Sequence, residues 1–235
     1  MISVCIPTFN GEKFIKEQLD SILRQISDGD EVVISDDSST DRTVEIIKSL
    51  ADPRIILLPN QKFKSPIFNV ENALKGAKGS YIFLADQDDI WLNGRVDKML
   101  NLLDNNDLVL SDCKVVDNNL TVIFNSYFKL VGARPGFFRN LLRTSPYIGC
   151  CMAFRRRVLE EALPFPAEIP MHDFWIAMIS EVKFKICFLH DPLVLYRRHS
   201  DNASITASRN TNSIFKKMAF RITLLRLLTI RLLRF

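Results

Sequence analysis

Acidic side chains gather at two places in the chain, each directly after a short apolar run. Residues 36–41 read DDSSTD, and residues 86–89 read DQDD. Carboxylates that crowd together repel one another, so they require a cation, a proton or hydrogen-bond donors nearby. Hard divalent cations such as Mg²⁺ and Mn²⁺ take oxygen ligands, typically one or two carboxylates together with the phosphates of a substrate. The pattern therefore indicates a site for a divalent cation and a phosphorylated substrate.

A structural interpretation of the first cluster stays open. The sequence Asp-Ser-Ser-Thr-Asp also suits a turn followed by a helix cap, so bonds to backbone N–H groups explain Asp36 and Asp41 equally well. The second cluster is harder to explain in this way, because three carboxylates in four residues exceed what a turn needs. We therefore expect chemistry chiefly from Asp86–Asp89.

Alternating strand and helix patterns in the first 110 residues would bring the two clusters together. Strands that alternate with helices form a parallel sheet covered on both faces, and ligands bind beyond the carboxyl ends of such strands. Because each cluster follows a strand, both are expected to line one crevice. The expected strands are 2–6, 31–35, 55–58, 81–85 and 108–110, and the expected helices are 14–26, 43–50, 67–77 and 96–103.

The pattern after residue 110 is less regular. We expect residues 111–205 to be a substrate-facing part of the same domain, and residues 206–235 to be a linker followed by a tail. Residues 200–213 are rich in Ser, Asn and Thr, which is typical of a flexible linker. The expected elements are strands at 113–124, 147–154, 184–189 and 193–196, a helix at 172–182, and a break at residues 134–136.

The composition excludes several classes of protein. The 235 residues suffice for a sizeable core, and 47% hydrophobic with 25% charged residues is typical of a globular chain. No stretch predicts a secretory leader or a membrane-spanning helix. Five cysteines without a CxxC spacing fit reduced thiols in a cytosol rather than a structural zinc site. Neither GxGxxG nor GxxxxGK[ST] occurs, so a metal would have to neutralise a bound nucleotide diphosphate.

The formal net charge of +4 is concentrated at the C-terminus. Residues 214–235 hold six basic residues and no acidic one, which leaves the rest of the chain slightly acidic. At helical spacing, most of these basic residues form one stripe on a largely apolar helix. Such a tail suits the headgroup region of an anionic membrane, with the groove of a partner protein as the competing interpretation. Nucleic acid is not favoured as a partner.

Six segments of the chain resemble motifs of family 2 glycosyltransferases with the GT-A fold. They occur in the expected order and cover roughly residues 1–205. The DQDDIW form is similar to the bacterial rhamnosyltransferase-like branch of that family. The resemblance implies an α/β, GT-A type nucleotide-diphospho-sugar transferase fold, a mostly parallel central sheet flanked by helices, here with a C-terminal amphipathic helical tail. The segments are residues 4–12 (VCIPTFNGE), 35–41 (SDDSSTD), 86–91 (DQDDIW), 149–156 (GCCMAFRR), 172–175 (HDFW) and 196–199 (YRRH).

The resemblance implies roles on the donor side. Asp37 matches the aspartate that hydrogen-bonds the imide of uracil or thymine, so the donor would be UDP- or dTDP-linked. Asp86 and Asp88 match the DxD pair of the family, with Asp88 as the ligand of Mn²⁺ or Mg²⁺ and Asp86 nearer the ribose. The remaining positions expected on the donor side are Pro7, Thr8, Asn10, Glu12 and, as assisting cations, Arg197 and Arg198.

The resemblance also implies a general base. Asp173 matches the residue that removes a proton from the acceptor hydroxyl in inverting members. Because Asp173 begins a predicted helix, capping of backbone amides is the alternative role. His199 is implied as a metal ligand or a donor to the diphosphate, and an ordinary surface or core histidine is the alternative. The acceptor-side positions are Asp89, Trp91, Gly149, His172 and Trp175, of which the two tryptophans equally fit a core.

The resulting hypothesis is a metal-dependent, inverting hexosyl- or rhamnosyltransferase. It would move a sugar from a nucleotide diphosphate to a glycan or a lipid-linked acceptor in bacterial surface polysaccharide synthesis. It would act in the cytoplasm, peripherally at the inner face of the cell membrane. One alternative is a membrane-associated protein that binds a nucleotide sugar without turnover. The other is a nucleotidyltransferase, although the usual glycine-rich phosphate loop of that class is missing.

Overall fold

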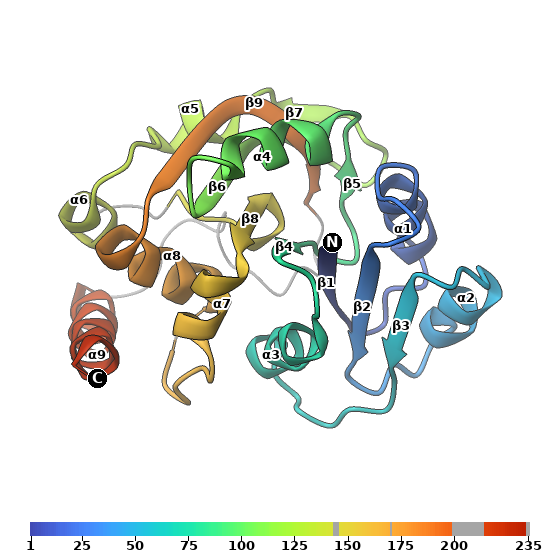
Figure 1. The fold of residues 1–235 in the computed structure, drawn as a ribbon, viewed down its shortest axis with the longest axis horizontal. Coiled ribbons are helices and arrows are strands. Elements are labelled where there is room, and N and C mark those ends of the chain that lie inside the picture. The colour runs from blue at the N-terminus through green and yellow to red at the C-terminus, as the bar shows by residue number, and fades with distance from the viewer. Residues whose placement is uncertain (143–145, 170, 199–213, 234–235) are drawn as a thin grey trace.

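The computed structural model describes residues 1–142, 146–169, 171–198 and 214–233 (Figure 1). The strands are β1 (Ile2–Thr8), β2 (Glu31–Asp36), β3 (Ile55–Leu58), β4 (Tyr81–Leu84), β5 (Ile90–Trp91), β6 (Leu108–Val116), β7 (Val122–Phe124), β8 (Met152–Arg155) and β9 (Ile186–Arg197). The helices are α1 (Ile15–Leu23), α2 (Thr43–Ser49), α3 (Pro66–Gly76), α4 (Arg95–Leu103), α5 (Tyr127–Val131), α6 (Phe137–Leu142), α7 (Arg156–Ala162), α8 (His172–Lys183) and α9 (Ile214–Leu232), with a 3₁₀ turn, η1, at Gly149–Cys151.

One sheet runs through both halves of the chain, in the order β3-β2-β1-β4-β8-β6-β9-β5, with β7 paired to β6. Strands β1 to β4 pair in parallel. Strand β8 is antiparallel to both β4 and β6, and β9 is parallel to β6. Strands β1, β2, β4, β6 and β9 therefore all end at the same edge of the sheet, and β8 begins there. This shared edge positions every loop that the sequence marked for chemistry.

The α/β architecture agrees with the expectation, although the sheet is parallel only in its first half and mixed in its second. The strand expected at 113–124 is a hairpin of β6 and β7, and the one expected at 147–154 is η1 followed by β8. The stretches 184–189 and 193–196 form a single strand, β9. Pro192 lies where the register between β6 and β9 shifts, because proline lacks the N–H that a regular ladder needs.

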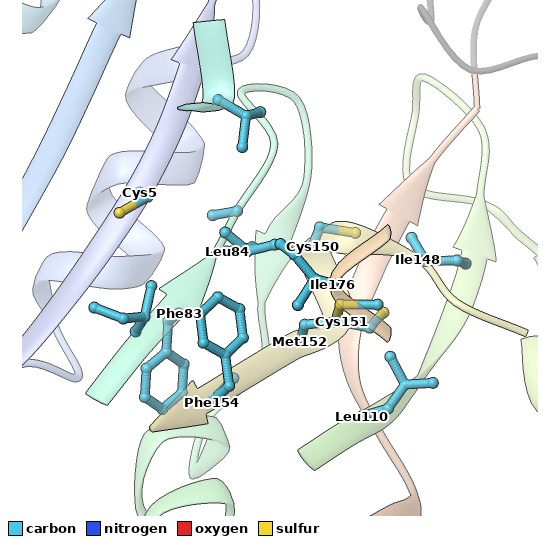
Figure 2. Packing of buried hydrophobic residues seen from close by; sticks show 14 of the residues in the cluster. Cys5, Phe83, Leu84, Leu110, Ile148, Cys150, Cys151, Met152, Phe154 and Ile176 are labelled. Atoms are coloured by element: carbon cyan, nitrogen blue, oxygen red, sulfur yellow. The ribbon is translucent and has the colours of Figure 1, made fainter. Parts of the chain in front are cut away.

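Both halves share one hydrophobic core (Figure 2). Phe83 on β4, Leu110 on β6 and Phe154 on β8 are fully buried, together with Ile176 of α8. Each such side chain stabilises the fold by roughly 1.5–3 kcal/mol. Helix α8 is buried on nearly all sides, which explains its lack of a polar face. Helix α3 packs on β1 and β2, and α4 packs on β6, β8 and β9.

The expected tail helix is present as α9, and it packs on α8. Leu224, Leu227 and Leu228 are buried in the common core. Two of its arginines reach across to the body: Arg221 donates to the carbonyl of Leu142 at 2.5 Å, and Arg231 donates to carbonyls of the α7 segment. In the described ranges, no helix has the length and apolar character needed to cross a bilayer. The linker expected at 200–213 lies outside the described residues.

Candidate active site

The DQDD loop connects β4 to β5 at the shared edge of the sheet. Asp88 and Asp89 are buried, and Asp86 is half-buried. The Gln18 side chain of α1 fixes the start of the loop by donating to the backbone carbonyl of Asp86 at 2.9 Å. Three carboxylates are therefore held in a small, largely dehydrated space rather than spread into solvent.

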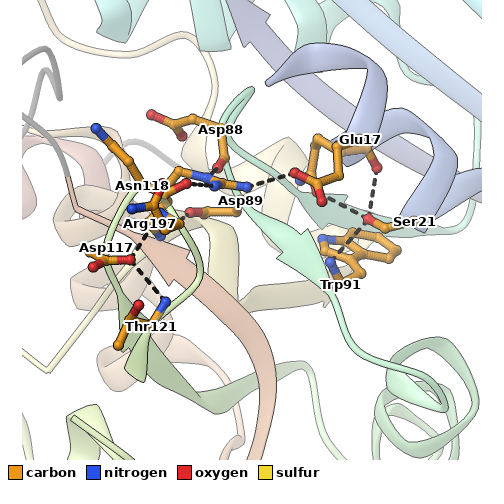
Figure 3. Close-up of polar contacts among 11 residues, drawn as sticks. Glu17, Ser21, Asp88, Asp89, Trp91, Asp117, Asn118, Thr121 and Arg197 are labelled. Carbon is orange, nitrogen blue, oxygen red and sulfur yellow. Dashed lines mark hydrogen bonds and ion pairs between the residues drawn. The ribbon is translucent and has the colours of Figure 1, made fainter. Parts of the chain in front are cut away.

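Arg197, at the end of β9, holds the other side of this loop (Figure 3). Its Nε donates to the carbonyl of Asp88 at 2.8 Å, and its backbone N–H donates to the Asp89 carboxylate at 2.9 Å. The guanidinium also pairs with Glu17 of α1 at 2.8 Å and lies over the Phe14 ring at 4.6 Å. Arg197 is almost completely buried. The expectation that it assists the diphosphate as a free cation is therefore wrong, because its donors are used to hold the loop.

The charged forms of Asp86 and Asp89 are disfavoured in this loop. Burial, and then the charges of Asp88 and Asp173, raise the pKa of Asp86 to about 8. Burial, and then the charges of Asp88 and Asp86, raise the pKa of Asp89 well above its usual range. One carboxylate oxygen of Asp89 is buried without a hydrogen-bond partner. Ligand atoms of Asp86, Asp89 and Cys150 lie within 4.8 Å of one another. The expected ligand Asp88 is not in this group, and burial raises the pKa of the Cys150 thiol well above its usual range, so the two carboxylates are the part suited to a hard divalent cation.

Asp173 faces the same crevice from the first turn of α8. Its carboxylate accepts the Phe174 N–H at 2.6 Å, and burial raises its pKa above the usual range for aspartate. The charge of Asp173 in turn contributes to the raised pKa of Asp86, so the two groups lie near each other. A Cβ at Gly149 would come within 2.9 Å of His172 Nε2. Gly149 therefore allows η1 to approach the start of α8.

The loops after β1 and β2 are joined by side chains that bind backbone. Asp37 accepts N–H groups of Phe63 at 2.6 Å and Ser65 at 3.3 Å, which fixes the loop before α3. Asn10 accepts the N–H of Thr40 at 2.9 Å, and Glu12 accepts that of Arg42 at 3.0 Å. Thr8 and the half-buried Pro7 close β1 at the same edge. The donor-side residues in these loops are thus brought together, at the ends of neighbouring strands.

The structural alternative is confirmed for two acids of the first cluster. Asp36 is fully buried and accepts the Thr8 hydroxyl at 2.9 Å and the Ser39 N–H at 2.9 Å. Asp41 accepts the backbone N–H groups of Glu12 and Thr43, each at 3.0 Å. These hydrogen bonds lower the pKa of Asp41 below its usual range. Both residues hold the loops in place.

The two tryptophans, Arg198 and His199 are the other residues expected at the site. Trp91 packs against Phe83 and is buried, and the fully buried Trp175 donates from its indole to the carbonyl of Ala162 at 3.0 Å. The expectation that they form an acceptor wall is therefore wrong, because both rings lie in the core. Arg198 is half-buried, with its guanidinium 5.4 Å from the centre of the Tyr196 ring. His199 lies outside the described residues.

Sequence reasoning missed residues that connect the parts of the site. The Gln87 side chain binds the backbone of Phe9 twice, accepting its N–H at 2.9 Å and donating to its carbonyl at 3.0 Å. A Cβ at Gly11 would overlap Gln87 Oε1, so the approach of the two loops requires glycine. Cys150 was missed as well. Two signals in the sequence could have pointed to these residues: Gln87 stands between Asp86 and Asp88, and Cys150 directly follows Gly149.

Comparison with known proteins identifies the family to which the chain belongs. The model of the family described as glycosyl transferase family 2 matches residues 3–163. The UDP-Glc:alpha-D-GlcNAc-diphosphoundecaprenol beta-1,3-glucosyltransferase WfgD of Escherichia coli is 26% identical over 185 residues, which are 77% of this chain and 70% of that protein. The dTDP-rhamnosyl transferase RfbG of Shigella flexneri is 30% identical over 214 residues, 83% of this chain and 72% of that protein.

Solved structures share the fold. S. aureus TarS 1-349 in complex with UDP-GlcNAc superposes with a TM-score of 0.72 at 23% identity, over 99% of this chain and 66% of that chain. The mannosyltransferase PcManGT from Pyrobaculum calidifontis, in complex with GDP-Man and Mn²⁺, gives 0.65 at 20% identity, over 98% of this chain and 64% of that chain. The chain thus spans about two thirds of the length of these neighbours. It belongs to glycosyl transferase family 2, and its fold is that of the GT-A glycosyltransferases.

Proposed function

We propose that this chain transfers a sugar from a UDP- or dTDP-linked donor to a lipid-linked or other glycan acceptor, with inversion at the anomeric carbon. The observation that carries the proposal is that η1 connects the DQDD loop with Asp173: a ligand atom of Cys150 lies within 4.8 Å of one of Asp86, and a Cβ at the adjacent Gly149 would lie 3.6 Å from Asp173 Cβ. Residues 1–110 would bind the donor and residues 111–205 the acceptor. The names of WfgD and RfbG support a nucleotide-sugar donor, and that of WfgD supports a diphosphoundecaprenol acceptor. The proposed reaction would belong to bacterial surface polysaccharide synthesis and would take place at the inner face of the cell membrane.

The residues of the crevice fit a resident Mn²⁺ or Mg²⁺. They supply several carboxylate oxygens, one of which, on Asp89, is buried without a partner. Asp88 would hold the cation, with Asp86 nearer the ribose, and His199 is a further proposed ligand. When bound, the cation would stabilise the charge that develops on the leaving nucleoside diphosphate. PcManGT was solved with Mn²⁺, which supports this choice of ion.

Asp173 is the proposed general base. The acceptor hydroxyl oxygen attacks the anomeric carbon, the bond from that carbon to the diphosphate breaks, and the hydroxyl proton passes to the Asp173 carboxylate. A single displacement of this kind inverts the anomeric centre. The burial that raises the pKa of Asp173 makes its carboxylate a stronger base than an exposed aspartate. Gly149 and His172 lie beside it and would face the acceptor.

Two substitutions test this function. Asp173→Asn is expected to lower transfer by roughly 10²–10⁴-fold, because it removes the base, while donor affinity measured by calorimetry changes little. Asp88→Ala is expected to abolish the Mn²⁺-dependent part of donor binding. The matched control is Asp97→Asn, an exposed acid in the first turn of α4.

The assay measures release of UDP or dTDP from a panel of nucleotide sugars with a lipid-linked acceptor. Full transfer by Asp173→Asn would contradict the assigned base. Donor binding by the unmodified chain with no transfer to any acceptor would instead favour the binding-protein alternative. In a parallel assay with a nucleoside triphosphate and a sugar 1-phosphate, formation of a nucleotide sugar with release of pyrophosphate would identify a nucleotidyltransferase.

A further inference from the structure

Large apolar side chains are exposed along one stretch of the second half of the chain. All three residues of strand β7 are exposed, as is Leu130 of α5. Phe138 of α6 is 74% exposed, the highest value of any large apolar side chain among the described residues, and Leu142 at the end of α6 is also exposed. Exposed apolar groups gathered in this way usually mark an interaction surface. We call β7, α5 and α6 together the β7–α6 surface.

All charged residues from residue 118 to residue 159, the stretch of chain that holds this surface, are basic. Residues 118–159 contain seven Lys or Arg residues and no Asp or Glu. Three of the seven, Lys129, Arg134 and Arg139, lie on or between α5 and α6. Three acids adjoin this surface, and each accepts hydrogen bonds from it. The buried Asp112 of β6 accepts the N–H of Phe128 at 2.9 Å and the hydroxyl of Ser126. The half-buried Glu181 of α8 accepts the N–H of Gly136 and the amide of Asn140, each at 3.1 Å, and the half-buried Asp117 accepts the N–H of Thr121 at 2.8 Å. The β7–α6 surface therefore offers apolar groups and cations, while the acids that adjoin it are engaged in hydrogen bonds.

Contacts join the parts of this surface. Phe124 and Leu130 line one open groove, so β7 and α5 adjoin. Arg139 of α6 donates to the carbonyl of Gly132, at the end of α5, at 2.7 Å. Arg221 of α9 then binds the carbonyl of Leu142. Figure 1 shows α5 and α6 at the margin of the molecule, with α9 next to the α6 end.

Helix α5 also connects this surface with the crevice. Its first residue, Tyr127, is buried; burial above all, with a smaller contribution from the Asp173 carboxylate, raises the pKa of Tyr127 to about 12. The exposed Lys129 and Leu130 follow within the same short helix. A molecule held at the β7–α6 surface would thus lie on the acceptor side of the proposed base.

We propose that the β7–α6 surface docks this chain on an anionic lipid bilayer. Apolar side chains that enter the headgroup region and cations that attract anionic lipid are the two components of such binding. The surface supplies both, whereas Arg221, Arg226 and Arg231 of α9 are bonded to the body of the protein. The inference rests on the proposed function in one respect: docking on the bilayer would bring a lipid-linked acceptor to Asp173.

The test is co-sedimentation of the full chain with vesicles that contain phosphatidylglycerol, compared with vesicles of phosphatidylcholine alone. We expect binding to the anionic vesicles that weakens at high salt. The double variant Lys129→Glu/Arg134→Glu should lower partitioning by about tenfold or more, because each cation near the surface contributes substantially. Phe138→Ser should lower it about fivefold. Lys48→Glu in α2 and Phe63→Ser are the matched controls, since both residues are exposed in the first half.

Three outcomes would overturn the proposal. They are equal binding to neutral and anionic vesicles, wild-type binding by the β7–α6 variants, and loss of binding in Lys216→Glu/Lys217→Glu with no change in those variants. The last outcome would assign the membrane contact to the tail instead. Circular dichroism and the melting temperature of each variant identify any that fail to fold. Release of UDP or dTDP with a water-soluble acceptor analogue, without vesicles, reports on the proposed function separately.

Discussion

The two halves of the molecule present different surfaces. Among the described residues, Met1, Phe9 and Phe63 are the exposed large apolar side chains of residues 1–110, whereas eleven follow residue 120. The first half instead uses side chains such as Asp37 and Gln87 to bind the backbone of neighbouring loops. In the proposed function, a small, charged donor would require fixed polar groups, while an acceptor attached to a lipid would require a surface. The difference between the halves matches this proposed division between two unlike substrates.

Arg197 joins the two halves, and its removal should have the largest effect. Arg197→Met leaves the Asp88 carbonyl and Glu17 without their donors, so we expect a loss of about 3–5 kcal/mol in the free energy of unfolding. Donor binding should weaken as well, because the DQDD loop is released. Urea denaturation and donor calorimetry measure the two effects. Glu17→Gln is the control, since it keeps an acceptor at the half-exposed end of the pair and should cost less. A stable Arg197→Met chain with normal donor affinity would show that the halves do not depend on this residue.

Two glycines allow the halves to be perturbed separately. Gly11→Ala forces Gln87 away from Phe9, so the loss of two hydrogen bonds should weaken donor affinity about tenfold with little change in acceptor KM. Gly149→Ala pushes on His172 beside Asp173 and should lower kcat by a similar factor while donor affinity stays constant. Steady-state kinetics with both substrates varied distinguishes the two. If both variants changed the same parameter, the division of labour between the halves would be wrong.

Metal removal and a change of pH should alter thermal stability less than the substitutions above, through the DQDD loop of the first half. The pKa of Asp86 is raised from its ordinary value near 4 to about 8, so between these values the folded state binds a proton that the unfolded state releases. Its contribution to stability is therefore present at low pH and is lost as pH rises through 8. We expect the melting temperature of the metal-free chain to fall by a few degrees between about pH 5 and 8, and Mn²⁺ to restore more of it at the higher pH. Differential scanning calorimetry measures this, and Asp86→Asn should flatten the dependence.

The sequence predicted the first half of the fold well, because its strands and helices alternate with clear periodicity. It predicted less of the second half. Two strands were expected at 184–189 and 193–196, yet β9 continues through Pro192 between them, since a shift of register absorbs the missing N–H. The short helices α5 and α6 were missed because five or six residues show little helical periodicity.

The motifs identified the loops of the site more reliably than the direction of each side chain. Asp86 and Asp88 follow β4 at the edge of the sheet that η1 and the start of α8 also reach, which agrees with the order of the motifs. Arg197 and Trp175 stand within motifs as well, but both side chains are buried. Adjacency in sequence does not determine which of two neighbouring side chains faces the core. Gln87 was overlooked for the same reason, since its role depends on a loop 78 residues earlier.

The uneven charge of the chain has a consequence for how the molecule approaches a surface. Residues 1–117 hold 20 acidic and 13 basic residues, whereas residues 122–142, which include β7, α5 and α6, hold three basic and no acidic ones. This separation gives the protein an electric dipole moment. Within about 8 Å of an anionic surface at physiological ionic strength, the field exerts a torque on that moment and turns the basic segment toward the surface. Orientation then precedes contact, and a larger fraction of collisions occurs with the acidic half facing the solution from which nucleotide sugars arrive.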